Sequence, residues 1–177
     1  MAHSLAVLIV EDNPYDAELI IYALRRAGYD VNAEVVDTEE ALFTALQSVW
    51  DIVLTDHALP ALSSQVVLEH LRRLPASPPC IIVSGCIGEE AATEAMRQGA
   101  VDFVNKQNLH RLVPVVERTL KEAENARARR EAQQRQQLLE DAIGQIEQGM
   151  LICAPAEPWP ITFANPAARE ILGYDEE

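Results

Sequence analysis

Five short apolar segments, each followed by a segment with helical spacing, constrain the fold of the first two thirds of the chain. The segments expected to form strands are 5–10, 31–36, 52–56, 80–83 and 101–105. Their nearly continuous apolar character is typical of strands that are covered on both faces of a parallel sheet. Helices are expected at 14–27, 39–48, 65–74, 89–98 and from 109 onward. This alternation predicts a doubly wound α/β domain with right-handed crossovers.

Polar side chains stand at the ends of four of these strands. Glu11 and Asp12 follow the first strand, Asp56 ends the third, Ser84 follows the fourth and Lys106 follows the fifth. In open α/β sheets, ligands bind outside the carboxyl ends of the strands. Taken singly, each residue is an ordinary turn or helix-start residue. Because chance rarely places all five at strand ends, together they predict one polar site at that edge of the sheet.

Three carboxylates gathered in one cleft would repel one another, so the site calls for a cation. Mg²⁺ prefers oxygen ligands and retains part of its water shell, which suits carboxylates at a strand edge. Beside such an ion, an ionised Asp56 can attack an electrophilic phosphorus and form an aspartyl phosphate. Lys106 and the Ser84 hydroxyl would then stabilise the phosphoryl oxygens.

These features resemble the response-regulator receiver domain. The resemblance rests on the acidic pair, an acceptor aspartate with proline four residues later (Asp56 and Pro60), Ser84 and Lys106. It implies a flavodoxin-like five-stranded sheet in the order 2-1-3-4-5. It also implies that Asp56 accepts a phosphoryl group from a phosphohistidine, carried by a histidine kinase or a phosphotransfer protein.

The resemblance assigns further roles to the residues of this edge. Ser84 and Phe103 match the positions that switch the output face after phosphorylation. The implied ligands of Mg²⁺ are Glu11, Asp12, Asp56 and the backbone carbonyl of Ala58.

Two positions depart from the receiver pattern. Gln107 follows the lysine where receivers usually have a proline in a cis peptide bond, and a cis bond before a non-proline residue costs about 2.5–4 kcal/mol. Ser64 stands where a glycine is common in the loop after the third strand. Neither change removes a chemical group from the site, so phosphorylation remains the expectation.

The sequence favours two other functions less. An interaction-only receiver, never phosphorylated, is disfavoured by the full set of acidic residues, serine and lysine. A phosphatase of the haloacid dehalogenase type also forms an aspartyl phosphate, but that family has a second aspartate two residues after the nucleophile, where this chain has Ala58.

Composition narrows the class of protein. The net charge of −14 argues against a nucleic-acid surface and leaves protein partners as the expectation. Cys80, Cys86 and Cys153 have neither disulfide nor zinc-site spacing, which favours a reducing cytoplasm. The apolar run 5–10 is too short for a signal peptide or a membrane span.

The helix that begins near Leu109 is expected to continue far beyond the α/β domain. Apolar residues cluster at 109–123 and at 138–146, and polar residues fill the stretch between them. A parallel homodimer through this coiled-coil linker is the favoured interpretation, because a polar middle weakens a seam but can fix its register. The alternative is a solvated single helix whose apolar ends dock on the flanking domains.

After Gly149, two strands and the start of a helix are expected, and the segment through Leu172, Gly173 and Tyr174 resembles the opening of a PAS sensory domain. The expected organisation is a receiver domain at 1–121, a helical linker at 122–147 and the first part of a PAS domain at 148–177. The sequence is interpreted as a fragment of a longer signalling protein. Histidine kinases and cyclic-dinucleotide enzymes both follow receiver and PAS modules, and the sequence does not name the output after Glu177.

Overall fold

The structure is a computed structural model that describes residues 3–57, 59–85, 89–155 and 157–173. The chain divides into two compact units, 1–124 and 125–177. No helix of the described residues is long and apolar enough to span a membrane.

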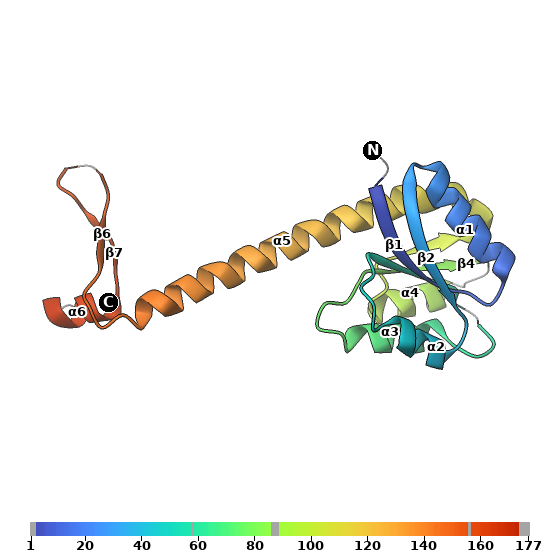
Figure 1. Ribbon diagram of the computed structural model, residues 1–177, viewed down its shortest axis with the longest axis horizontal. Helices are drawn as coiled ribbons and strands as arrows, with labels where there is room; N and C mark the ends of the chain where they lie inside the picture. The colour runs from blue at the N-terminus through green and yellow to red at the C-terminus, as the bar shows by residue number, and fades with distance from the viewer. Residues whose placement is uncertain (1–2, 58, 86–88, 156, 174–177) are drawn as a thin grey trace. The chain divides into compact units, whose positions relative to one another are not determined.

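The first unit is built on one parallel sheet of five strands in the order β2-β1-β3-β4-β5, which confirms the predicted fold class (Figure 1). The strands are β1 His3–Val10, β2 Tyr29–Val36, β3 Ile52–Thr55, β4 Cys80–Ser84 and β5 Asp102–Asn105. Every residue of β3 and β4 is buried, as expected for central strands with both faces covered.

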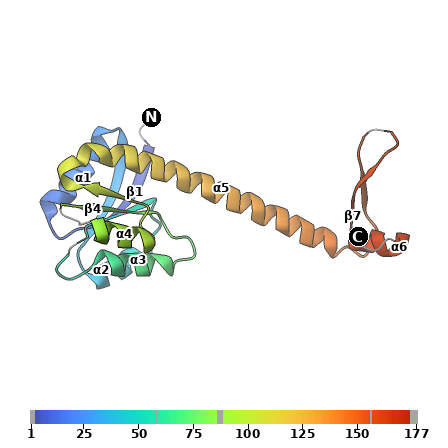
Figure 2. The same cartoon turned by 180° about the vertical axis from the view of Figure 1, so that it is seen from behind.

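Helices cover both faces of this sheet. The helices of the unit are α1 Pro14–Arg26, α2 Glu39–Ala45, α3 Ser64–Arg72, α4 Glu89–Arg97, the 3₁₀ helix η1 Lys106–Arg111, and α5 Leu112–Gly144, which extends into the second unit. Helix α1 and the first turns of α5 lie on one face, and α2, α3 and α4 lie on the other (Figures 1 and 2). Each layer encloses its own hydrophobic core, one against α1 and α5 and one against α2, α3 and α4.

Local side chains fix where the helices begin. Asn13 caps α1 by accepting a hydrogen bond from the Tyr15 backbone N–H at 3.1 Å, and Pro14 occupies the first helical position. Thr38 and Ser63 cap α2 and α3 in the same way. These caps fix the residues at which the three helices begin.

The entry into the last helix of the unit differs from the expectation of an α-helix starting near Leu109. The chain first forms η1, because Asn105 accepts a hydrogen bond from the Gln107 backbone N–H at 2.8 Å and so starts a helical turn directly at Lys106. Asn108, with φ −122° and ψ 43°, breaks this turn before α5 begins. The Lys106–Gln107 peptide bond is trans, since Glu157–Pro158 is the one cis bond in the described part of the chain.

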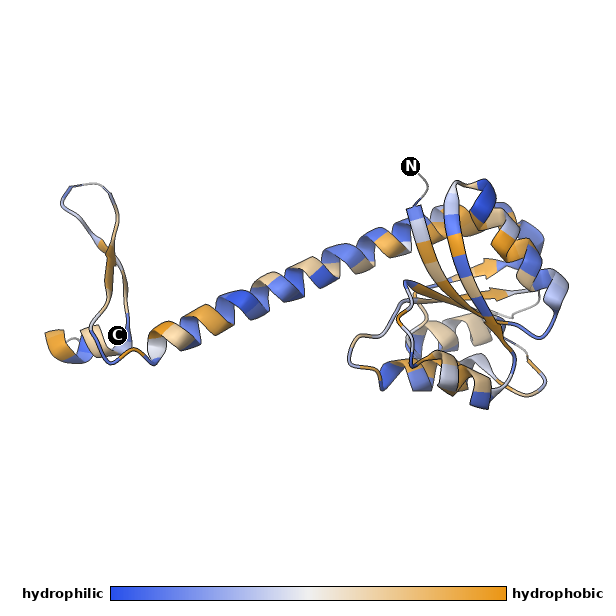
Figure 3. Ribbon diagram, in the orientation of Figure 1, coloured by the Kyte–Doolittle hydropathy of each residue, from blue (hydrophilic) through white to orange (hydrophobic). Residues whose placement is uncertain are grey.

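The second unit contains the end of α5, an antiparallel pair of strands, β6 Leu151–Cys153 and β7 Ile161–Ala164, and helix α6 Pro166–Leu172. Hydrophilic residues prevail along α5 (Figure 3), yet Leu138 and Leu139 near its end are exposed. Asn165 is fully buried and joins two segments of this unit. Its side-chain oxygen accepts hydrogen bonds from the backbone N–H groups of Met150, before β6, and Ala168, in α6, at 2.7 and 2.9 Å.

Candidate functional site

Backbone pairing at the carboxyl edge of the sheet places two acidic side chains next to each other. The Asp56 N–H donates to the Val10 carbonyl at 2.9 Å, which aligns the residue after β3 with the end of β1. The Glu11 N–H donates to the Val36 carbonyl at 2.9 Å, which holds the residue after β1 in the sheet. Glu11 and Asp56 are therefore fixed by the sheet itself rather than by flexible loops.

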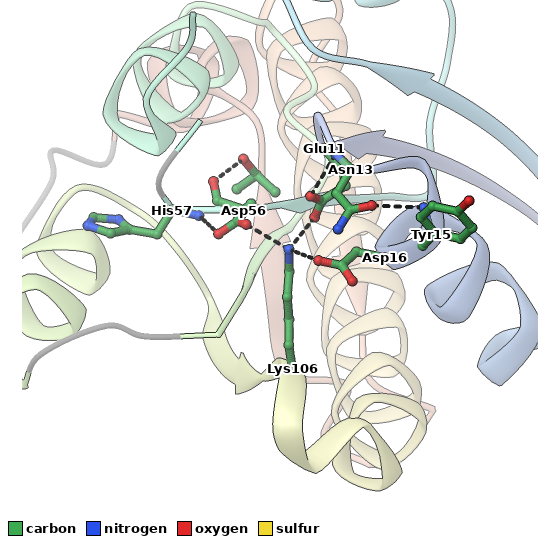
Figure 4. Close-up of polar contacts among 8 residues, drawn as sticks. Glu11, Asn13, Tyr15, Asp16, Asp56, His57 and Lys106 are labelled. Carbon is green, nitrogen blue, oxygen red and sulfur yellow. Dashed lines mark hydrogen bonds and ion pairs between the residues drawn. The ribbon is translucent and has the colours of Figure 1, made fainter. Parts of the chain in front are cut away.

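Lys106 joins these two acids from the end of β5. Its ammonium nitrogen lies 2.7 Å from Glu11 Oε2, 2.7 Å from Asp56 Oδ2 and 2.7 Å from Asp16 Oδ2 (Figure 4). The contacts to Asp16 and Asp56 are hydrogen bonds, whereas the contact to Glu11 is an ion pair outside hydrogen-bond geometry. One lysine thus neutralises part of the charge of three carboxylates.

The electrostatics of the cluster follow from its burial. Desolvation raises the pKa of Glu11 above its usual value, although Lys106 and a hydrogen bond from the Asn13 backbone oppose the shift. Burial alone would lower the pKa of Lys106, but the hydrogen bonds with Asp16 and Asp56 and the ion pair with Glu11 outweigh it and raise that pKa. The lysine is therefore firmly protonated, and the cluster keeps a negative net charge.

The other predicted site residues that the structure describes differ in exposure. Ser84 ends β4 and is buried, as is the rest of that strand. Phe103 on β5 is half-buried and packs on the core beneath α2, α3 and α4. Asp12 is exposed and does not contact Lys106 in the described part of the structure. Ala58, whose carbonyl was expected to bind Mg²⁺, lies outside the described residues.

Asp16 is the member of the cluster that sequence reasoning missed. It lies in the first turn of α1, where an acidic residue is common because it interacts favourably with the helix dipole. The sequence shows only that Asp16 lies three residues after the helix cap Asn13 and four after Asp12, so that it falls in the first turn of the helix. A helix starting at that edge brings its first turn back over the site.

The oxygen atoms of the cluster are of the type that binds a hard cation, but they are not arranged around a metal site. All its ligating atoms are carboxylate oxygens, and the buried Glu11 Oε2 accepts no hydrogen bond. Such oxygens are the ligands that Mg²⁺ prefers. Among the residues described here, however, no three acidic, histidine or cysteine side chains are arranged as metal ligands. The position among the oxygens is held by the Lys106 ammonium.

A cleft of about 300 Å³ opens beside the carboxyl end of β3. It is lined by His57 and Ser64 after β3, by Ala91 and Glu94 of α4, and by Gln98 directly after that helix. The His57 backbone N–H donates to Asp56 Oδ1 at 2.5 Å, and its Nδ1 lies 2.9 Å from Ser64 Oγ. Ser64 therefore orients the residue that follows Asp56, which gives this departure from the receiver pattern a structural role.

Comparison with protein families identifies the first unit. The family model of the response regulator receiver domain matches residues 7–117. The nitrogen assimilation regulatory protein NtrX of Azorhizobium caulinodans is 32% identical over 141 residues, covering 78% of this chain and 30% of that protein. The tetrathionate response regulatory protein TtrR of Salmonella typhimurium is 31% identical over 126 residues, covering 70% of this chain and 60% of that protein. The chain thus spans less than two thirds of either regulator.

Solved structures agree with this match. The signal receiver domain of a putative Luxo repressor protein from Vibrio parahaemolyticus has a TM-score of 0.63 and 27% identity, over 71% of this chain and 96% of that one. A structure of NtrX from Brucella abortus has a TM-score of 0.64 and 25% identity, over 81% of this chain and 35% of that one. The family model covers well over half of the sequence, so this chain belongs to the response-regulator receiver domain family.

Proposed function

We propose that Asp56 accepts a phosphoryl group from a phosphohistidine of a histidine kinase or a phosphotransfer protein. The observation that supports this most is the ion pair between Lys106 and Asp56, 2.7 Å apart at the carboxyl edge of the parallel sheet. A carboxylate beside a protonated lysine has both the nucleophile and the cation that phosphoryl transfer needs.

The proposed transfer exchanges one bond for another. A carboxylate oxygen of Asp56 forms a bond to phosphorus while the bond from phosphorus to the imidazole nitrogen breaks. The electron pair stays on that nitrogen, which takes up a proton from solvent. Lys106, freed from the charge of the Asp56 carboxylate, donates to a phosphoryl oxygen instead.

We assign Mg²⁺ binding to Glu11 and Asp56, with Asp12 turning in from its exposed position. The ion would supply charge neutralisation for the phosphoryl oxygens. The buried Glu11 Oε2 supports this assignment, because its contact with Lys106 is an ion pair and leaves its hydrogen-bonding capacity unused. Of the implied ligands, the carbonyl of Ala58 is carried over from the family pattern.

Ser84 and Phe103 are proposed to transmit the phosphorylated state. A phosphoryl group offers new acceptor oxygens, so the Ser84 hydroxyl at the end of β4 gains by turning toward it. Phe103, half-buried on the neighbouring strand β5, would fill the space that Ser84 vacates. The face made by α4 and β5 would then change its packing.

The segments after the receiver domain are proposed to carry that change onward. In this proposal, 122–147 forms a parallel coiled coil in a homodimer and 148–177 begins a PAS module. The exposure of Leu138 and Leu139 supports the coiled coil, because two adjacent exposed leucines on a helix are typical of a surface that a second helix covers.

Intact-mass spectrometry after incubation with acetyl phosphate and Mg²⁺ tests the acceptor. We expect one added phosphoryl group in the parent chain and none in Asp56→Asn. Asp37→Asn is the matched control, because Asp37 is an exposed aspartate that directly follows β2 at the same sheet edge. Labelling of Asp56→Asn at the parent level would refute the assignment.

A further inference from the structure

Asp16 shares Lys106 with the two acids of the proposed metal site but differs from both in its surroundings. The side chains of Glu11 and Asp56 are 1% and 12% exposed, whereas that of Asp16 is 30% exposed. Asp16 also comes from helix α1, while the other two follow strands. It is therefore the outermost carboxylate of the cluster (Figure 4).

Binding of Mg²⁺ at this cluster creates a conflict for Lys106. Its ammonium group lies 2.7 Å from one oxygen each of Glu11 and Asp56, the same oxygens a metal ion would approach. Two positive charges cannot share those oxygens at close range without strong repulsion. Lys106 must then move away from them, yet its side chain is only 16% exposed and water can solvate it only in part. A buried ammonium without a partner is costly.

We propose that Asp16 is a positioning residue that keeps Lys106 paired when Glu11 and Asp56 bind the metal. This inference rests on the function proposed above. An ammonium group has three N–H donors. In the metal-bound site, Asp16 holds one of them, and the other two are directed inward for the phosphoryl oxygens. Asp16 thus makes metal binding and the lysine's role compatible within one small cluster.

Substitution of Asp16 should weaken Mg²⁺ binding. In the metal-bound state Lys106 has left Glu11 and Asp56 and is paired with Asp16 alone. This pairing does not exist in the metal-free state. A charge-assisted hydrogen bond at a partly exposed site corresponds to a loss of about 5- to 10-fold in Mg²⁺ affinity for Asp16→Asn. Asp16→Glu keeps the carboxylate and should recover most of this affinity.

Glu18→Gln is the matched control for charge. Glu18 lies on the same helix and is exposed, and its substitution removes the same single negative charge. Calorimetric Mg²⁺ titration of the full chain should give a change of less than about 2-fold for this variant, because exposed charges are well screened. An equal loss of Mg²⁺ affinity in Glu18→Gln and Asp16→Asn would overturn the inference, because the loss would then follow from the change in net charge alone.

A double substitution separates positioning from direct metal ligation. In a Lys106→Met background, Asp16→Asn should no longer alter Mg²⁺ affinity, since Asp16 acts through the lysine. If Asp16→Asn weakens Mg²⁺ equally in both backgrounds, Asp16 is a ligand of the ion and the inference is wrong.

A spectroscopic measurement tests the same point with Lys106 in place. The chain contains two lysines, Lys106 and the exposed Lys121, so lysine labelled with ¹⁵N gives a simple ammonium spectrum. The Lys106 ammonium signal should persist on addition of Mg²⁺ in the parent, and should broaden through solvent exchange in Asp16→Asn. A signal that Mg²⁺ affects identically in both chains would refute the positioning role.

The parent chain serves to separate the two proposals. If the parent itself does not bind Mg²⁺, both this inference and the metal part of the proposed function fail. If the parent binds Mg²⁺ and Asp16→Asn binds it equally well, only the inference about Asp16 fails.

Discussion

Replacement of Lys106 by methionine should destabilise the receiver domain strongly in the absence of divalent cations. Each of the three carboxylate oxygens lies 2.7 Å from the same nitrogen, so no two of them are more than about twice that distance, ~5.4 Å, apart. At an effective dielectric constant of about 20, two unit charges at that separation repel by roughly 3 kcal/mol. Replacement of the lysine removes the positive charge that offsets this repulsion.

The exposure of each acid indicates how far the variant can relax. Asp16 is 30% exposed and can turn toward solvent, but Glu11 and Asp56, at 1% and 12%, cannot. The repulsion of that remaining pair and the lost ion pairs together predict a loss of about 3–5 kcal/mol at pH 7, as for other broken buried pairs.

Mg²⁺ and acid should each restore stability to Lys106→Met. Mg²⁺ at a concentration of a hundred times its Kd should raise the free energy of unfolding by about 2.7 kcal/mol. Like-charge repulsion raises the pKa of the clustered carboxyls in the folded variant, so their stabilising contribution is present at low pH and is lost as pH rises through the raised pKa. The difference between parent and variant should therefore shrink on acidification.

Urea unfolding followed by Trp50 fluorescence measures these effects within the first unit. Trp50 packs against the core under α2 and α3, and its indole N–H donates to the Ala45 carbonyl at 2.8 Å. A Trp159→Phe background removes the second tryptophan. Lys121→Met, at an exposed position of α5, is the control. If Lys106→Met loses no more stability than Lys121→Met, or if Mg²⁺ fails to recover it, the cluster does not behave as described.

Three further predictions concern other parts of the chain. Because the pKa of Glu11 is raised in the folded state, its favourable contribution to stability is present below about pH 4.5 and is lost as pH rises through the folded-state pKa. Over that interval Glu11→Gln should gain stability relative to the parent in urea titrations. A difference in stability that does not change with pH would contradict this. Asn165→Ala should cost the second unit about 2–4 kcal/mol and speed hydrogen exchange at the Met150 and Ala168 amides, with unchanged exchange as the contrary result. In sedimentation at tens of micromolar, roughly the range where weak coiled coils associate, the full chain should dimerise and a truncation at Leu120 should not; equal behaviour would exclude the linker as the dimerising element.

The fold of the first unit could be predicted because its strands are short and apolar and each is followed by polar or turn residues. The central strands β3 and β4 are covered on both faces and therefore consist almost wholly of apolar residues, which the pattern of the sequence reveals directly. Their carboxyl ends are marked by Asp56 and Ser84. Because parallel strands end at one edge, the meeting of Asp56 with Glu11 and Lys106 also followed from the order of the chain.

The features of the structure that could not be predicted depend on local turns rather than on the periodic spacing of apolar residues. A 3₁₀ helix in place of the first α-helical turn follows from the Asn105 cap and the conformation of Asn108, and both residues are ordinary loop residues in the sequence. Asp16 was missed for a related reason: a first-turn acid already has a sufficient explanation in the helix dipole. Its pairing with Lys106 depends on the angle at which α1 leaves β1, which no local pattern encodes.

Lys106 lies where a movement at the site would act on α5. Lys106 is the first residue of η1, which passes directly into α5, so a movement of the lysine acts at the start of that helix. The first turns of α5 are held by the buried Leu112 and Val116. At its other end the Asn165 amide donates to the Ile143 carbonyl in the last turn at 3.4 Å and, beyond the helix, to the carbonyls of Ile146 at 3.2 Å and Gln148 at 2.9 Å. A helix secured at both ends passes on a displacement that a fraying end would absorb. We therefore expect Asn165→Asp, which keeps the capping oxygen for Ala168 but loses these donors, to loosen the end of α5 in hydrogen exchange while leaving α6 protected. Loss of protection in α6 alone would show that Asn165 serves only as its cap.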